Sequence, residues 1–421
     1  MKYVIIIHGI VNMGGGQQYC SNKVCELKRR GYEVSIISSD SGIVILDSLK
    51  EYQGGIIPEL RYSPICFSKK KRKRIINLIE RIIGGIDQNT IIDSAGPSYS
   101  LWGEILAQKY SCKHVCMFID ESFSLSNDEL AFLKFKHEHR ELLGTSKKTF
   151  HKIFGDYYQV KNEEQYCFNP WNLNVVQDYN LPLIDEIPFG EYDFSIAIFS
   201  RLDKPFITPT LVSLIQYIEN HRGKSFLIIL VGGTERKAEE RRILRYFDKA
   251  PNCKAIVTGF LFPVPRILFK RVDLFISSAS SATVAASEGV PTIYVHCESG
   301  LPSGILNYDV FEGEGLPDLR YQGSNHSLSY YLDFVLFNKS IVLNRIPSVE
   351  RNESTIVAES ISAQLVFVNQ NGNKTYYPVL SIRPSRIQMI EMILLNTLGT
   401  KMTDFLILQV VHRMKKRNKH Y

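Results

Sequence analysis

A regular alternation of strand and helix patterns opens the chain and limits what it can fold into. An apolar strand pattern, Tyr3–Ile7, precedes a glycine-rich turn at residues 14–16 and a helical run that ends before Gly31. A second strand pattern follows at Glu33–Ser38. Strand, helix and strand in this order predict a βαβ unit with parallel strands, so the predicted fold class is α/β.

The alternation continues and then starts afresh in the second half of the chain. The first half has further strand patterns near Thr90–Asp93 and His114–Ile119, and helical runs near Arg74–Ile83 and Leu101–Tyr110. After the proline-bearing stretch Pro182–Pro188, the new series runs through the strand pattern Phe194–Phe199, the helical run Thr210–Asn220 and the strand pattern Phe226–Val231. This restart predicts two separate sheets with a hinge at the proline-bearing stretch.

Three parts are therefore predicted: an N-terminal domain at 1–188, a C-terminal domain at 189–380 and closing helices at 381–421. Late in the second domain, Gln364–Asn369 and Lys374–Tyr377 flank Asn371 and Gly372, a pattern that favours a β-hairpin. Helical runs at Ser385–Leu398 and Met402–Met414 follow, and we expect them to pack back on the first domain.

Composition excludes several classes of protein. With 421 residues, 44% of them apolar and 22% charged, the chain can bury two ordinary cores and is too apolar for a disordered protein. The apolar run at its start contains His8 and Gly9 and has no cleavage site after it, so it indicates a buried strand and a soluble cytoplasmic protein. The eight cysteines lack paired spacing, so neither a zinc site nor a disulfide framework is predicted.

Several short motifs carry a resemblance to a known family. The first βαβ unit holds Gly14, Gly15 and Gly16 at the start of its helix and Arg30-Gly31-Tyr32-Glu33-Val34 at its end. The second series contains Ser200-Arg201-Leu202-Asp203-Lys204, Val231-Gly232-Gly233-Thr234-Glu235, Val257-Thr258-Gly259-Phe260 and Ala285-Ala286-Ser287-Glu288-Gly289-Val290-Pro291. In order and spacing, these motifs resemble family-4 glycosyltransferases of the GT-B fold.

The resemblance implies a fold and an activity. It implies two Rossmann-like domains facing a cleft, and transfer of a sugar from a nucleotide-sugar donor to a saccharide or lipid-linked saccharide acceptor in cell-surface polysaccharide synthesis. It also implies transfer without a metal or other cofactor.

Candidate donor-binding residues follow the strands of the second series. They are Arg201, Lys204, Gly232, Gly233, Gly259, Ser280, Ser281, Thr283, Glu288 and Glu298. Cations, hydroxyls and backbone N–H groups at the carboxyl ends of parallel strands suit a diphosphate, and the glycine loop at residues 14–16 offers a second anion-binding turn on the acceptor side. Arg201 in a surface salt bridge, Glu288 on a solvated helix face and a glycine turn without a ligand are the alternative interpretations.

The sequence departs from the family at its catalytic residues. Val284 stands where the family has a glutamate, and the run Ser277–Thr283 is more similar to the donor loop of the lipid-linked-sugar enzymes of peptidoglycan synthesis. The family's histidine after a first-domain strand is replaced by Asp120 and Glu121. Either carboxylate is a candidate general base for the acceptor hydroxyl, and helix capping is the other interpretation.

A run of six cations, Lys69–Arg74, precedes an apolar stripe with helical spacing. Anionic lipid at the inner membrane face is one explanation, and a solvated loop before a core helix is the other. Nucleic acid is not expected as a partner, because no nucleic-acid-binding motif accompanies the run.

Two other functions remain open at this stage. A catalytically degenerate GT-B protein that only binds sugars would explain the missing glutamate and histidine. An NAD-dependent oxidoreductase would explain the first glycine turn and Asp40 after the second strand, but the third glycine of the dinucleotide fingerprint is missing.

Overall fold

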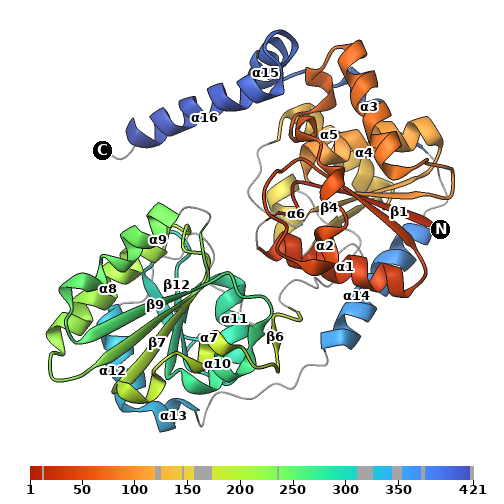
Figure 1. Ribbon diagram of the computed structural model, residues 1–421. Coiled ribbons are helices and arrows are strands. Elements are labelled where there is room, and N and C mark those ends of the chain that lie inside the picture. Colours follow the sequence, from red (N-terminus) through yellow and green to blue (C-terminus); the bar gives the residue numbers. More distant parts are fainter. Residues whose placement is uncertain are drawn as a thin grey trace. The chain divides into compact units, whose positions relative to one another are not determined.

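The computed structural model describes residues 1–11, 14–118, 125–144, 147–155, 173–234, 237–310, 326–343, 353–370 and 375–417. The chain divides into two compact units (Figure 1). The first unit combines Met1–Trp171 with Ser354–Tyr421, and the second consists of Asn172–Glu353. No helix among the described residues is both long and apolar enough to span a membrane.

The first unit is built on a five-stranded parallel sheet in the order β2-β1-β3-β4-β5. Its strands are β1 Lys2–Ile7, β2 Glu33–Ser38, β3 Ile91–Ala95, β4 Lys113–Phe118 and β5 Leu142–Gly144. The helices between them are α1 Gly15–Arg29, α2 Asp47–Lys50, α3 Lys69–Ile83, α4 Pro97–Tyr110, α5 Asn127–Glu138 and α6 Lys147–Phe154, with the short 3-10 helices η1 Gln53–Gly55, η2 Pro58–Arg61 and η3 Pro64–Cys66. The C-terminal segment adds α14 Glu353–Asn369, η8 Val379–Ser381, α15 Arg386–Thr397 and α16 Thr400–Arg417.

The second unit holds a six-stranded sheet in the order β13-β12-β11-β7-β8-β9, in which only β13 runs antiparallel to its neighbour. Its strands are β7 Phe194–Phe199, β8 Phe226–Val231, β9 Cys253–Gly259, β11 Leu274–Ser277, β12 Thr292–Val295 and β13 Pro302–Ile305, and a separate pair joins β6 Val176–Gln177 to β10 Val264–Pro265. The helices are α7 Pro182–Asp185, α8 Ile207–Asn220, α9 Lys237–Leu244, α10 Arg266–Arg271, α11 Ala279–Ser287, α12 Leu328–Phe337 and α13 Lys339–Leu343, with 3-10 helices η5 Phe189–Glu191 and η6 Phe247–Lys249.

The central strands of the second sheet are buried on both faces. All six residues of β8 are buried, which is the pattern of a parallel strand covered by helices on either side. Successive residues alternate between two cores: Ile228 and Leu230 pack with α8, whereas Leu227 and Ile229 pack with α10. The predicted strands Phe194–Phe199 and Phe226–Val231 are therefore confirmed to the residue.

A buried lysine ties the C-terminal segment to the first unit. Lys23 on α1 is 1% exposed and pairs with the Asp93 carboxylate of β3. Its ammonium also donates to Gln364 Oε1 on α14 at 2.7 Å and to the Tyr19 hydroxyl at 3.0 Å. Burial is the largest single effect and opposes the charge, but Asp93, Tyr19 and Tyr3 together outweigh it and raise the pKa of Lys23. A charge this deeply buried needs every one of these partners, so α14 is held in place on the first sheet.

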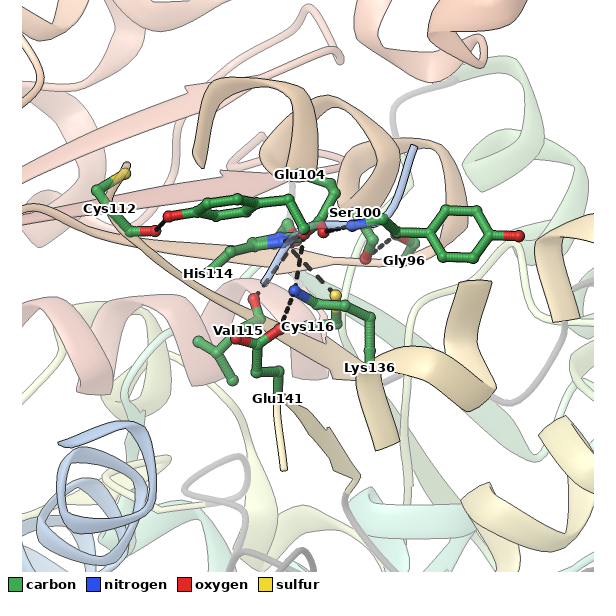
Figure 2. A network of polar contacts seen from close by, with 12 residues as sticks. Gly96, Ser100, Glu104, Cys112, His114, Val115, Cys116, Lys136 and Glu141 are labelled. Atoms are coloured by element: carbon green, nitrogen blue, oxygen red, sulfur yellow. Dashed lines mark hydrogen bonds and ion pairs between the residues drawn. The ribbon is translucent and has the colours of Figure 1, made fainter. Parts of the chain in front are cut away.

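A second buried network fixes the segment after α14 (Figure 2). Glu104 on α4 lies 2.6 Å from His114 Nδ1 and accepts from Lys136 Nζ at 2.7 Å. Its other oxygen accepts the backbone N–H of Tyr377 at 2.7 Å. Burial opposes ionisation of Glu104, yet Lys136 and His114 lower its pKa to about 2. Burial and the Lys136 charge lower the pKa of His114 to about 4, so the imidazole is neutral at pH 7.

These contacts correct two predictions. Gln364–Asn369 is not a hairpin strand but the end of α14, where Val357, Ile361, Leu365 and Val368 are buried at helical spacing. The unit boundaries also differ from the predicted ones. Residues 354–380 belong to the first unit through the two buried networks, and the second unit begins before residue 189 because β6 pairs with β10.

Candidate functional site

The carboxyl ends of the parallel strands β7, β8, β9, β11 and β12 meet at one edge of the second sheet. Ligands of open α/β sheets bind at this edge. Arg201 follows β7, Gly232 follows β8, Ser278 follows β11 and His296 follows β12. The structure thus brings together most of the residues that the sequence assigned to a donor site.

The loop after β7 and the loop after β8 pack against each other at Gly232 and Gly233. A Cβ atom at Gly232 would lie 2.0 Å from the carbonyl oxygen of Ser200, and its φ of +145° is itself unfavourable for other residues. Leu202 N–H donates to the Gly233 carbonyl at 3.0 Å, and a Cβ atom at Gly233 would lie 3.0 Å from the Phe260 ring. The glycine pair therefore locks the loop after β7 to the loop after β8, and Gly259 ends the next strand beside it.

Arg201 extends from this locked loop with 38% of its side chain exposed. Its Nε atom lies 3.2 Å from Asp203 Oδ1, and the Asp203 side chain is 52% exposed. Nε is buried and makes no hydrogen bond, so the contact is an ion pair of poor geometry. Exposed pairs of this kind contribute little to stability, and a phosphate can replace Asp203 at small cost. Lys204 is exposed in the turn that leads into α8.

The N-terminus of α11 lies at the same edge and has no side-chain cap. Ser278 occupies the capping position with extended backbone angles, but its hydroxyl does not bond to the helix. Instead it lies beside the Tyr294 hydroxyl, whose pKa is raised by burial and lowered in part by the Ala279 N–H and by Ser278. No acidic residue occupies the first turn, where Ser280 and Ser281 are half-buried. Such a terminus offers free N–H groups and a partial positive charge to an anion.

Two other predicted donor-binding residues, Thr283 and Glu288, are placed differently, whereas Glu298 follows β12 at the sheet edge. Thr283 is buried at 6% exposure on the core side of α11. Glu288 is the C-terminal cap residue of α11 and pairs with Arg266, which also contacts Asp178 at 3.2 Å. A nine-residue helix separates Glu288 from the sheet edge by about 13 Å, so its contacts favour the structural interpretation. Glu298 is exposed at the tip of the turn after β12.

The first unit has a polar cluster at the carboxyl edge of its own sheet, which the sequence did not predict. His8 directly follows β1, and 66% of its side chain is exposed. Its Nδ1 lies 2.9 Å from the Tyr99 hydroxyl, which lies 2.8 Å from Ser39 Oγ. Ser39 Oγ donates to the His8 carbonyl at 2.9 Å. Arg61 donates to the Ser39 carbonyl at 2.9 Å.

Counting protons in this cluster assigns the His8 tautomer. The single hydroxyl proton of Ser39 is used on the His8 carbonyl, so Tyr99 must donate to Ser39. Tyr99 then accepts at its oxygen, and His8 Nδ1 carries the proton. Burial raises the pKa of Tyr99 to about 12, so its proton stays in place at neutral pH. In the neutral ring, the lone pair then lies on His8 Nε2, which is 3.6 Å from Asp40 Oδ2.

Gly14 precedes α1, and Gly15 and Gly16 begin it, with no side-chain cap and no acidic residue in the first turn. Asp120 and Glu121 lie outside the described residues. Among the described residues, no group of three or more His, Cys, Asp or Glu side chains is arranged to hold a metal ion.

Three solved structures share this fold. The Anabaena protein Alr3699/HepE, in complex with UDP and glucose, matches with a TM-score of 0.53 and 12% identity over 88% of this chain and 98% of that one. A glycosyltransferase from Rickettsia africae ESF-5 matches with a TM-score of 0.51 and 14% identity, over 88% and 97% of the two chains. Sucrose-phosphate synthase from Thermosynechococcus elongatus matches with a TM-score of 0.50 and 12% identity, over 88% and 97%.

These matches confirm the predicted fold class, an α/β protein with two Rossmann-like units of the GT-B type. No protein-family model and no curated protein matches the sequence.

Proposed function

We propose that this chain is a glycosyltransferase that moves a sugar from a nucleotide-sugar donor to a saccharide or lipid-linked saccharide acceptor. The observation that carries the proposal is the meeting of Arg201, the locked glycine loops and the uncapped α11 N-terminus at one sheet edge. Similarity of fold to Alr3699/HepE, determined with UDP and glucose, and to a glycosyltransferase from Rickettsia africae supports it.

Transfer of this kind requires positive charge from the protein next to the diphosphate leaving group. The acceptor hydroxyl oxygen forms a bond to the anomeric carbon while the bond from that carbon to the diphosphate breaks. The nucleoside diphosphate leaves with the bonding electrons, and the hydroxyl proton passes to a base. Arg201, Lys204 and the first turn of α11 supply the charge in this proposal, with Ser280 and Ser281 as hydroxyl donors, so transfer proceeds without a metal.

The base belongs to the first unit in this proposal. Asp120 and Glu121 remain the carboxylates proposed from the sequence. His8 is a further candidate, because Nε2 can accept a proton and Asp40 stands close enough to stabilise the resulting imidazolium. The pH profile of transfer by His8→Gln, set against that of Asp120→Asn, separates the two assignments.

The finer assignment keeps the resemblance found in the sequence. We propose a family-4 type enzyme of cell-surface polysaccharide synthesis that works in the cytoplasm at the inner membrane face. A thermal-shift screen against UDP-, GDP- and CMP-sugars identifies the donor nucleotide. Release of the free nucleotide in the presence of an acceptor distinguishes a transferase from a protein that only binds sugars.

Arg201→Ala tests the donor site directly. Loss of a charged hydrogen-bonding fork from a diphosphate costs about 1.5 to 3 kcal/mol, so affinity for the nucleoside diphosphate should fall roughly ten- to hundredfold. Arg201→Lys should recover only part, because an ammonium lacks the planar fork. Titration calorimetry measures both.

The matched control is Arg242→Ala, which removes another exposed arginine of the second unit, paired with Glu239 on α9. Its nucleotide affinity and melting temperature should equal those of the wild type. Wild-type affinity in Arg201→Ala would remove the donor site from this sheet edge.

A further inference from the structure

Helices α15 and α16 present a row of exposed apolar side chains on the first unit. Six apolar residues of these helices are each 49% to 70% exposed: Ile387, Ile390, Ile393, Leu398, Met402 and Phe405. We call this set the α15–α16 apolar face. Steps of three residues place the three isoleucines along one side of α15. Single exposed apolar residues are ordinary, but a row of this kind marks a binding surface.

The two helices are firmly attached by their opposite sides. Leu395 is buried at 1% exposure, and Asn396 donates to the Cys66 carbonyl at 2.9 Å. On α16, Asp404 lies 3.2 Å from Arg61 Nη1 and accepts from the Tyr62 hydroxyl at 2.5 Å. The inner sides of α15 and α16 thus pack on the first unit, and the apolar face is left for another partner.

A group of exposed cations lies beside the end of α15. The start of α3 adjoins the end of α15, because Lys71 donates to the Leu395 and Asn396 carbonyls at 2.7 and 3.2 Å. Lys71 is therefore structural, as is Arg72, which donates to the Pro64 and Phe67 carbonyls. The other cations of the run, and two on the helices themselves, are exposed: Lys69, Lys70, Lys73, Arg74, Arg386 and Lys401. Among the described residues, no ion pair neutralises any of these six.

A hollow of about 460 Å³ runs along the exposed side of α3. Its lining is mostly cationic: Lys70, Lys73, Arg74, Asn77, Leu78 and Arg81. Such a hollow can receive a phosphate group between several positive charges, because nothing on its lining carries a negative charge.

We propose that this surface docks on an anionic lipid bilayer, with the α15–α16 apolar face in the interfacial layer and the α3 cations on the headgroup phosphates. Lasting attachment of a peripheral protein takes two signals, and apolar insertion together with a cationic patch supplies both. A second copy of this chain is the poorer occupant. Two-fold pairing through the apolar face brings two clusters of unpaired cations together.

Flotation with large unilamellar vesicles tests the docking with the full-length protein. Vesicles of equal parts phosphatidylcholine and phosphatidylglycerol should bind the protein, and pure phosphatidylcholine should bind it far more weakly. Ile390→Ser with Ile393→Ser keeps the charge and should lower partitioning about tenfold or more. Its control, Val212→Ser with Leu301→Ser, changes two exposed apolar residues of the second unit and should bind as the wild type does.

A charge variant tests the other signal. Replacing Lys69, Lys70 and Lys73 by glutamine should lower partitioning about fivefold for each cation removed, and the loss should shrink at high salt. The matched control replaces three exposed lysines of the second unit by glutamine: Lys237, Lys249 and Lys254.

The proposal fails if both test variants bind mixed vesicles like the wild type. It also fails if the wild type does not prefer anionic vesicles. Light scattering adds a third outcome that overturns it: a wild-type dimer that the double serine variant converts to a monomer would make this face an interface between copies. None of these results depends on nucleotide binding, so the donor site stands or falls separately.

Discussion

Replacing Gly232 by alanine tests whether the locked loops form the base of the candidate donor site. The added Cβ atom would lie 2.0 Å from the Ser200 carbonyl oxygen and 2.8 Å from the carbonyl carbon, far inside van der Waals contact. The backbone must move, and the loop that moves carries Arg201. We expect about 1 to 3 kcal/mol of destabilisation from the φ of the new residue and about as much again from the displaced backbone. The melting temperature of the second unit should fall by about 5 to 20 °C.

Gly289→Ala is the matched control for this substitution. Gly289 also has a positive φ, +78°, but a Cβ atom there meets nothing within 4 Å. Only the backbone cost of about 1 to 2 kcal/mol applies, and nucleotide affinity should be unchanged. Scanning calorimetry and titration with UDP measure both variants. The reasoning is refuted if Gly232→Ala melts together with Gly289→Ala and binds UDP as tightly as the wild type does.

Two further predictions concern the first unit. In the folded state, the pKa of Glu104 is about 2 and that of His114 is about 4, below their usual values of 4.5 and 6.5. The stability that each group adds to the folded protein is therefore present above its usual pKa and is lost as the pH falls. The melting temperature should drop between pH 6.5 and 4 and again toward pH 2, and the first drop should be smaller in a folded His114→Gln variant. Tyr99→Phe removes the hydroxyl that accepts the His8 Nδ1 proton, so His8 should leave the Nδ1–H tautomer. Long-range ¹⁵N correlation spectra measure this change, and an unchanged spectrum would contradict the proton count.

The fold was largely predictable because the central strands of the second sheet, such as Phe194–Phe199 and Phe226–Val231, are short apolar runs bounded by turn residues. Phe226–Val231 is buried at every position, and such a run has no other stable place than a covered parallel sheet. The C-terminal segment was not predictable in the same way. The local sequence favours a strand at Val366, Phe367 and Val368. However, Gln364 accepts a hydrogen bond from Lys23, 341 residues away in sequence, and this buried contact stabilises the helix instead.

The placement of the candidate site residues was predictable where it follows from position after a strand, as for Arg201 and Ser280. The surroundings of a residue were not predictable where they depend on which way a helix presents its side chains. Thr283 and Glu288 lie on the same helix as Ser280, but one is buried in the core and the other pairs with Arg266 at the far end. His8 was treated only as evidence against a signal sequence. Its proposed role as a proton acceptor depends on Tyr99, on helix α4, and on Ser39, which follows β2, and these residues are brought together only by folding.

Substitution of Asp203 tests the role of charge in the proposed donor site. A diphosphate brings about two negative charges, whereas the site offers Arg201, Lys204 and the partial charge of the α11 N-terminus. Asp203 cancels part of this charge by its contact with Arg201 at 3.2 Å. Asp203→Asn removes the competing carboxylate at nearly constant size. Because the pair is exposed and screened, the gain should be at most about 1 kcal/mol, which is up to about fivefold tighter nucleotide binding in calorimetry. The gain should vanish in Arg201→Ala with Asp203→Asn, because the carboxylate acts through Arg201. Weaker binding by Asp203→Asn would mean that Asp203 positions Arg201 for the phosphate, and the assignment of a competing role would be wrong.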